Sequence, residues 1–292
     1  MSEQIDIGAA NGSAANASLT IPQASLRDLL LALADDEFVT GYANSEWTGI
    51  APVLEEDIAF SSLAQDELGH ARALYELAAD VGAGEARSNL SPDPRPLTPD
   101  SLAYGRAPEQ YRHARLCEQP RGDWAYSVSR QFLYDTADTV RLEALMRSSY
   151  GPLARLAARI IREEKYHLLH AHTWLRQLAE GGDEARARQR AAFEALWPDA
   201  SGLWEPLPGE AALVAAGVLP EPFAALEQRW LARIEEPLRR YGLPWPFAEH
   251  GSGWAPLVAP AYGGRRGMHG PAFRALHAEM TSVSRAEPGA QW

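Results

Sequence analysis

Apolar side chains recur along this chain with the period of an α-helix. In the first patterned segment, Leu26, Leu29, Leu30 and Leu33 are spaced so that they share one helical face, and Phe38 continues that face. No segment alternates apolar and polar residues in the way that predicts a β-strand. The pattern predicts helices at about 25–42, 53–81, 123–149, 153–179, 183–197, 220–241 and 271–286.

Turn-forming residues arrange the first four helices as two hairpins. Short connections at 44–52 and at Gly151-Pro152 join the helices within each hairpin, whereas 83–122 contains six prolines and has room for one short helix near 108–115. One long crossover between two helical hairpins is typical of a ferritin-like bundle. We therefore predict an all-α fold, a ferritin-like four-helix bundle with additional C-terminal helices and an irregular tail.

The two ends of the chain differ from the bundle in composition. The N-terminal segment is rich in Ala, Ser, Asn and Gly, which predicts a flexible tail, and the segment after Tyr241 is rich in Gly, Pro and Trp. The C-terminal segment lacks a hydrophobic repeat, so we expect it to pack on the bundle or on a partner. We interpret Gly263-Gly264-Arg265-Arg266-Gly267 as a turn with exposed arginines. The predicted division is a tail at 1–24 and one ferritin-like domain at 25–292, with the bundle at about 25–180 and the extension at 181–292.

Composition excludes several classes of function. The formal net charge of −12 argues against nucleic-acid binding, which needs a basic face. Lys165 is the single lysine, so a phosphate-binding Gly-Lys-Ser/Thr loop is absent, and Cys117 is the single cysteine, which excludes disulfides and thiolate metal sites within the chain. No apolar run approaches the roughly 20 residues of a membrane span, and no signal peptide is recognisable. We expect a cytoplasmic protein without nucleic-acid or membrane partners.

The candidate chemistry is a repeated Glu-x-x-His motif. Glu67 and His70 are three residues apart, as are Glu164 and His167. Positions i and i+3 share a helical face, so each pair can point into the bundle. One such pair arises easily by chance, but two pairs, each in the middle of a long predicted helix, indicate a carboxylate-bridged two-metal centre.

An acidic residue precedes each motif by nearly the same distance. Glu37 lies 30 residues before Glu67, and Asp135 lies 29 residues before Glu164. Two antiparallel helices and a tight turn need about this spacing to bring two side chains level. Four carboxylates balance two divalent cations, and oxygen and imidazole ligands suit iron or manganese. The predicted metal ligands are Glu37, Glu67, His70, Asp135, Glu164 and His167.

Two of these positions have competitors in the sequence. Asp35 and Asp36 adjoin Glu37, and Asp138 lies one helical turn after Asp135. The pattern favours Glu37 and Asp135 and leaves the other acids open as alternatives.

Other side chains near the motifs receive different interpretations. Asp66 and Glu163 directly precede the motif glutamates, at positions that often hold acceptors for a metal-binding histidine. Four further side chains are interpreted as lying outside the centre, the tyrosines packed in the core and the histidines packed or solvated: Tyr134, Tyr166, His170 and His172.

Several short stretches resemble the ring-1,2-phenylacetyl-CoA epoxidase family of aerobic phenylacetate catabolism. They are Glu118-Gln119-Pro120, Gly122-Asp123-Trp124-Ala125, Ser149-Tyr150-Gly151-Pro152, Gly263-Gly264 and Gly267-Met268-His269. The ending, with Leu276, Glu279-Met280, Pro288-Gly289 and Gln291-Trp292, is similar to that of the C-type subunit. The resemblance covers nearly everything after residue 25.

The resemblance implies a multicomponent di-iron monooxygenase that activates dioxygen and inserts one oxygen atom into the aromatic ring of phenylacetyl-CoA. The implied partners are a homologous catalytic A-type subunit together with a small B-type subunit and an NADPH-dependent reductase subunit, in a dimer or larger oligomer. C-type subunits in that family are mainly structural and commonly lack several metal ligands, whereas this chain has candidates at all six positions. The alternative is a free-standing ferritin-like di-metal oxidase that handles iron or peroxide.

Overall fold

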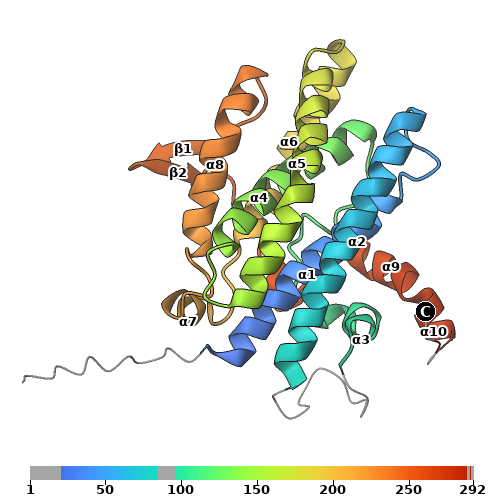
Figure 1. Ribbon diagram of the computed structural model, residues 1–292. Helices are drawn as coiled ribbons and strands as arrows, with labels where there is room; N and C mark the ends of the chain where they lie inside the picture. Colours follow the sequence, from blue (N-terminus) through green and yellow to red (C-terminus); the bar gives the residue numbers. More distant parts are fainter. Residues whose placement is uncertain (1–20, 84–96, 288–289, 291–292) are drawn as a thin grey trace, which may run out of the picture.

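Four long helices form the centre of the molecule in the computed structural model, which describes residues 21–83, 97–287 and 290 (Figure 1). Helix α1 packs along α2, and α4 packs along α5, so that the chain forms two hairpins. Their bounds are α1 Gln23–Ser45, α2 Leu54–Ala83, α4 Trp124–Leu145 and α5 Gly151–Ala179. The all-α prediction is confirmed, and the helices expected for the bundle occur within a few residues of their predicted bounds.

Local sequence signals explain where the bundle helices begin. The side chain of Asp123 caps α4 by accepting a hydrogen bond of 2.8 Å from the backbone N–H of Tyr126. Helix α5 has Pro152 in its first turn, where a missing N–H costs nothing. Helix α1 is buried on nearly all sides along its length, so it is the central element of the bundle.

Shorter elements surround the bundle. Helices α6 and α8 cover α4, and β1 pairs antiparallel with β2 in a hairpin beside α8. In the view of Figure 1, α8 and this hairpin lie on one flank and α9 and α10 on the other. The bounds are α3 Pro99–Tyr104, η1 Pro108–Gln110, α6 Asp183–Ser201, η2 Gly202–Trp204, α7 Glu210–Ala215, α8 Phe223–Arg240, β1 Phe247–His250, β2 Gly253–Pro256, η3 Gly264–Arg266, α9 Pro271–Met280 and α10 Ser282–Ala286.

One apolar core continues from the bundle into the C-terminal segment. Leu30, Phe132 and Ile160 of the bundle belong to the same buried cluster as Trp230 of α8 and Phe273 of α9. The segment after α8 is therefore packed against the bundle helices through its own aromatic side chains. The tail predicted at 1–24 falls mostly on residues outside the described part, as do the terminal residues Pro288-Gly289 and Gln291-Trp292.

Four expectations for the irregular segments are wrong. The β1–β2 hairpin exists although no strand was expected, and the helix expected near 108–115 is reduced to the three-residue turn η1. The helix expected at 271–286 is interrupted at Thr281. Both arginines of the turn at 263–267 were expected to be exposed. Arg266 is exposed, but Arg265 is buried, with 1% of its surface exposed.

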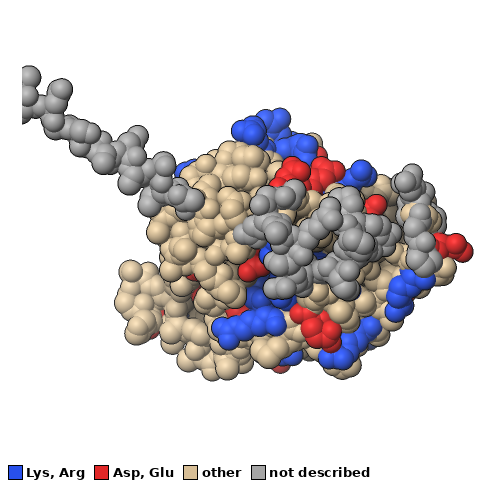
Figure 2. All heavy atoms as spheres, turned by 90° about the horizontal axis from the view of Figure 1, so that it is seen from below, with Lys and Arg blue, Asp and Glu red and all other residues tan. Residues whose placement is uncertain are grey.

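The surface carries charges of both signs. On the face shown in Figure 2, basic and acidic side chains are interspersed and wide areas carry neither. Among the described residues, no helix combines the length and the apolar character that crossing a bilayer requires.

Candidate metal centre

The six predicted metal ligands converge in the interior of the bundle. One comes from α1, two from α2, one from α4 and two from α5, and each is at most 4% exposed: Glu37, Glu67, His70, Asp135, Glu164 and His167 (the metal-centre cluster). Donor atoms of Glu37, Glu67 and His70 lie within 4.8 Å of one another, as do those of Glu67, Asp135 and His167. Glu67 belongs to both groups and therefore lies between them.

Both histidines turn the same ring nitrogen toward the carboxylates. His70 Nδ1 lies 3.3 Å from Glu37 Oε2 and 3.6 Å from Glu164 Oε1. His167 Nδ1 lies 3.3 Å from the same Glu164 oxygen and 3.5 Å from Glu67 Oε1. The two ring centroids are 6.2 Å apart. Glu164 thus contacts Nδ1 of both histidines, and the two Nδ1 atoms point toward the same group of carboxylates.

The outer nitrogens of these rings are held by acids, as expected. His70 Nε2 lies 2.7 Å from Glu163 Oε2, and His167 Nε2 lies 3.3 Å from Asp66 Oδ2. Each acid comes from the helix opposite its histidine, so α2 and α5 are joined twice. An acceptor at Nε2 fixes the tautomer in which Nδ1 is free to bind a metal.

The three consecutive acids of α1 have different partners. Asp35 accepts a hydrogen bond of 3.0 Å from Arg106, and both oxygens of Asp36 lie 2.8 Å from the guanidinium of Arg265. Among the described residues, Glu37 has no hydrogen bond or ion pair with an arginine, and its Oε2 lies 3.3 Å from His70 Nδ1. The geometry therefore favours Glu37 as the ligand from this helix.

Asp135 and Asp138 are distinguished in the same way. Asp138 Oδ1 accepts hydrogen bonds of 3.1 Å and 2.8 Å from Arg141, one turn along the same helix, whereas both oxygens of Asp135 have no partner. The arrangement favours Asp135 as the ligand. The role of Arg141 was missed in the sequence, although its spacing from Asp138 is that of a helical ion pair.

Side chains interpreted as lying outside the centre are divided by the structure. Tyr134 is buried and donates a hydrogen bond of 2.9 Å to Glu37 Oε1, so it contacts the centre directly. Tyr166 is 62% exposed, which contradicts the expected core packing. His170 is half-buried and His172 is exposed, and neither belongs to a group of candidate metal ligands among the described residues.

Electrostatics in the centre favour bound protons when no metal neutralises the acids. Burial, together with neighbouring carboxylates, raises the pKa of Glu67 and Glu164 well above the usual range and that of Asp135 to about 7. Burial alone would lower the pKa of His167, but its hydrogen bond to an acid and nearby carboxylates raise it to about 9. Burial would raise the pKa of Glu37, but hydrogen bonds outweigh it and lower the pKa to about 2.

The donor set fits a pair of divalent ions. Both oxygens of Glu67, Asp135 and Glu164 and Nδ1 of His167 are buried without a hydrogen-bond partner. Unpartnered buried charges are costly, and a cation removes that cost. Four carboxylates supply four negative charges, and oxygen and imidazole donors are the ligands of iron and manganese. These buried groups could hold a metal.

Sequence comparison agrees with this architecture. The family model for phenylacetic acid catabolic proteins matches residues 11–292. The chain belongs to this family. It is similar to the C-type subunit of the 1,2-phenylacetyl-CoA epoxidase of Escherichia coli (strain K12), with 30% identity over 262 residues, covering 90% of this chain and 97% of that protein. It is also similar to the A-type subunit of the same enzyme, with 27% identity over 164 residues, 56% of this chain and 48% of that protein.

Proposed function

We propose that this chain is a C-type subunit of a phenylacetyl-CoA epoxidase in phenylacetate catabolism and that it also holds a di-metal centre, most suited to iron or manganese. The observation that carries the proposal is a complete buried cluster of four carboxylates and two imidazoles in a chain whose similarity to a C-type subunit covers 90% of its length. The proposed ligands are Glu37, Glu67, His70, Asp135, Glu164 and His167.

Different side chains around the centre would bind the pair of metal ions and orient its ligands. When bound, the metal pair would supply dioxygen activation. Nδ1 of each histidine and the carboxylates would bind it, while Glu163 and Asp66 keep the outer imidazole nitrogens in place. Tyr134 holds Glu37 by its hydrogen bond. A small pocket bordered by Glu37 and Asp138 is lined otherwise by aliphatic side chains, so this side of the carboxylates is apolar.

The proposed partners are a homologous A-type subunit together with a small B-type subunit and an NADPH-dependent reductase subunit, assembled in the cytoplasm. Similarity to two different subunits of one enzyme supports the assembly. Co-expression of the tagged chain with an A-type subunit from the same cell is expected to give a stable complex on gel filtration. Separate elution of the two chains at micromolar concentration would contradict the subunit assignment.

Elemental analysis tests the metal centre independently of assembly. Protein produced with iron and manganese is expected to bind about two ions per chain, and Glu67→Ala is expected to bind well under one, because Glu67 contributes to both groups of donors. Glu76→Ala is the matched control, since this glutamate lies on the same helix with its side chain 56% exposed. Metal content well under one ion per chain, unchanged in Glu67→Ala, would remove the metal centre and leave the subunit assignment standing.

A free-standing di-metal oxidase is the second candidate. It is favoured by one observation, namely that all six donors come from a single chain. Oxidation of ferrous iron or turnover of peroxide by the isolated chain, without any partner subunit, would support it over the epoxidase role.

A further inference from the structure

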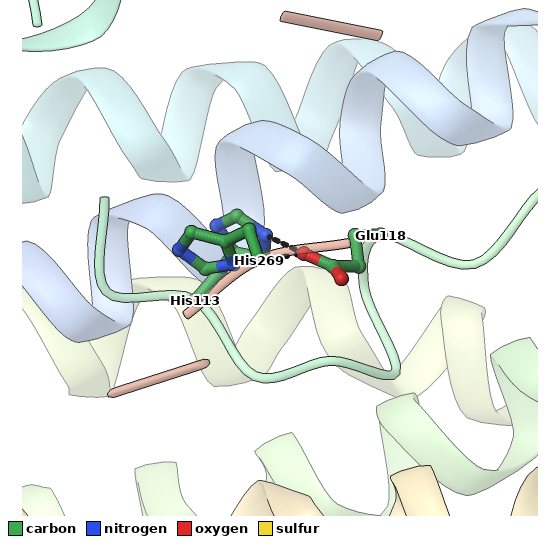
Figure 3. Close-up of side chains that lie close together, drawn as sticks. All are labelled: His113, Glu118 and His269. Carbon is green, nitrogen blue, oxygen red and sulfur yellow. Dashed lines mark hydrogen bonds and ion pairs between the residues drawn. The ribbon is translucent and has the colours of Figure 1, made fainter. Parts of the chain in front are cut away.

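A second group of buried polar side chains lies away from the metal-centre cluster. His113 and Glu118 belong to the crossover between the two hairpins, and His269 precedes α9 (Figure 3). None of the three is more than 9% exposed, and one donor atom of each lies within 4.8 Å of the others. Two stretches noted in the sequence, Glu118-Gln119-Pro120 and Gly267-Met268-His269, meet at this point.

A hydrogen bond shows which ring nitrogen of His269 carries a hydrogen, namely Nε2. Its Nε2 lies 3.1 Å from the carbonyl oxygen of Tyr111, which can only accept, so Nε2 carries a hydrogen. In the neutral ring, Nδ1 then has a lone pair, and it lies 2.8 Å from Glu118 Oε2. Two lone pairs cannot face each other at this distance unless something positive lies between them. The cluster therefore needs a cation, either a proton or a metal ion.

The second histidine converges on the same oxygen. His113 Nε2 lies 3.0 Å from Glu118 Oε2, and the two imidazole rings are stacked with centroids 3.9 Å apart. His113 is fully buried and its other ring nitrogen, Nδ1, has no hydrogen-bond partner among the described residues, so Glu118 is the one acid of that part of the chain in contact with this ring. His113 can meet Glu118 either by donating a hydrogen from Nε2 or by sharing the Nε2 lone pair with a cation, and a single metal ion would take the second arrangement at both rings.

Backbone atoms hold two of the three donors, Glu118 and His269, in orientation. The backbone N–H of Gly270 donates a hydrogen bond of 2.9 Å to Glu118 Oε1, which leaves Oε2 facing the rings. The carbonyl of Tyr111 does the same for His269. Backbone acceptors of this kind accompany metal-binding histidines in many proteins. The ring of Phe273 covers both imidazoles, with its centroid 4.3 Å from that of His113 and 4.8 Å from that of His269, so the site is closed to solvent on this side.

We propose that His113, Glu118 and His269 form a second cation site, for one divalent ion of the zinc class, that fastens the crossover to the C-terminal segment. Two imidazoles and one carboxylate are a donor set that zinc accepts, and the absence of thiolate is compatible with it. The ion would join residues more than 150 positions apart, since His269 and Glu118 are separated by 151. Its role is structural, because the closed site offers no path for a substrate.

Zinc binding tests the proposal in full-length protein that lacks the main centre. In a Glu67→Gln, Glu164→Gln background, chelator-treated protein is loaded with Zn²⁺ alone, dialysed and analysed for zinc. We expect one ion per chain, reduced to near zero by a further His269→Asn. The matched control is His277→Asn, since His277 is similarly buried in α9 and its Nε2 also lies beside a backbone carbonyl, that of Arg106.

A second measurement locates the ion without any substitution in the cluster. Anomalous scattering at the zinc edge from crystals of the loaded protein is expected to give a peak between the three side chains. Absence of the peak would overturn the proposal, as would zinc retained in a folded His269→Asn. Nitrogen NMR that finds both ring nitrogens of His269 protonated in excess zinc would also overturn it and would identify a proton as the cation.

Discussion

Three consecutive acids of α1 divide the buried charge of this protein into two regions. Asp35 and Asp36 enter a layer of ion pairs whose members are Asp35, Asp36, Arg106, Arg141 and Arg265 (the arginine layer). Glu37, the next residue, enters the metal-centre cluster, where no arginine is a hydrogen-bond partner of the six candidate ligands. Both regions are equally buried, so burial alone does not separate structural acids from candidate ligands.

The difference lies in how the charge is neutralised. Burial would raise the pKa of Asp36, but Arg265 and Arg141 outweigh it and lower the pKa to about 2. This acid is therefore ionised, and the two arginines neutralise its charge. Burial raises the pKa of Glu67 well above the usual range, and the neighbouring carboxylates raise it further. A buried acid without a counter-charge inside the protein is therefore the better candidate for binding a metal cation.

Breaking the arginine layer is expected to have the largest effect. Arg265→Ala removes two hydrogen bonds from Asp36 and leaves part of a buried charge uncompensated, which typically costs about 3–5 kcal/mol of folding free energy. Urea denaturation measures the loss. The control is Arg274→Ala, whose side chain is 62% exposed and whose ion-pair partner Glu109 is 58% exposed, so that its removal should change stability by less than about 0.5 kcal/mol. Equal effects of the two substitutions would contradict the buried pairing.

Removing an outer acceptor of the metal-centre cluster is expected to act on metal affinity instead. Glu163→Gln and Asp66→Asn each replace an acid that holds a histidine Nε2, and loss of such a partner typically lowers metal affinity about 10–100-fold. Competition with a chelating dye measures the affinity. Glu163 is 50% exposed at its side chain, so stability of the metal-free protein should scarcely change. Unaltered affinity in both variants would show that the histidines do not bind the metal.

The pH dependence of stability should also separate the two regions. His167 and Glu67 have raised pKa values in the fold, so the folded chain binds more protons than the unfolded chain, and stability falls as pH rises. We expect the metal-free protein to lose on the order of 1 kcal/mol between pH 7 and 9. Asp36, with its pKa lowered to about 2, contributes constantly in this window and loses its contribution only in acid. Thermal denaturation of chelated and metal-loaded samples tests the slope, which metal should reduce.

The smallest effect concerns Cys117, which borders the arginine layer. Its thiol lies 3.6 Å from Asp36, and burial raises its pKa well above the usual range. Because the thiolate is the reactive form, the native protein should not react with a disulfide reagent on the time scale of minutes, and urea should release one equivalent. Rapid labelling of the folded chain would show that the layer opens readily.

The sequence predicted the bundle and the metal-centre cluster because both depend on regular helical spacing. The interval from Glu37 to Glu67, and that from Asp135 to Glu164, translate directly into convergence when two helices lie antiparallel. The pattern favoured Glu37 over its neighbours Asp35 and Asp36 but could not exclude them, because the choice depends on where the arginines lie.

The irregular segments were predicted least well. Arg265 follows two glycines in what resembles an exposed turn, and nothing local indicates that it reaches into α1. The β1–β2 hairpin is only four residues long on each side, and Gln228 of α8 holds it by hydrogen bonds to Trp254. Such structure is determined by tertiary contacts, which a one-dimensional pattern does not contain.

The pairing of Asp36 with Arg265 has a consequence for how the chain is made. The two residues are 229 positions apart, so a ribosome synthesises the acid long before its main counter-charge. All four bundle helices emerge before that counter-charge does, and until then their interior has an excess of negative charge. Completion of the native interior therefore waits until Arg265 has been synthesised, and a chain truncated before Arg265 would leave Asp36 with Arg141 as its remaining arginine partner.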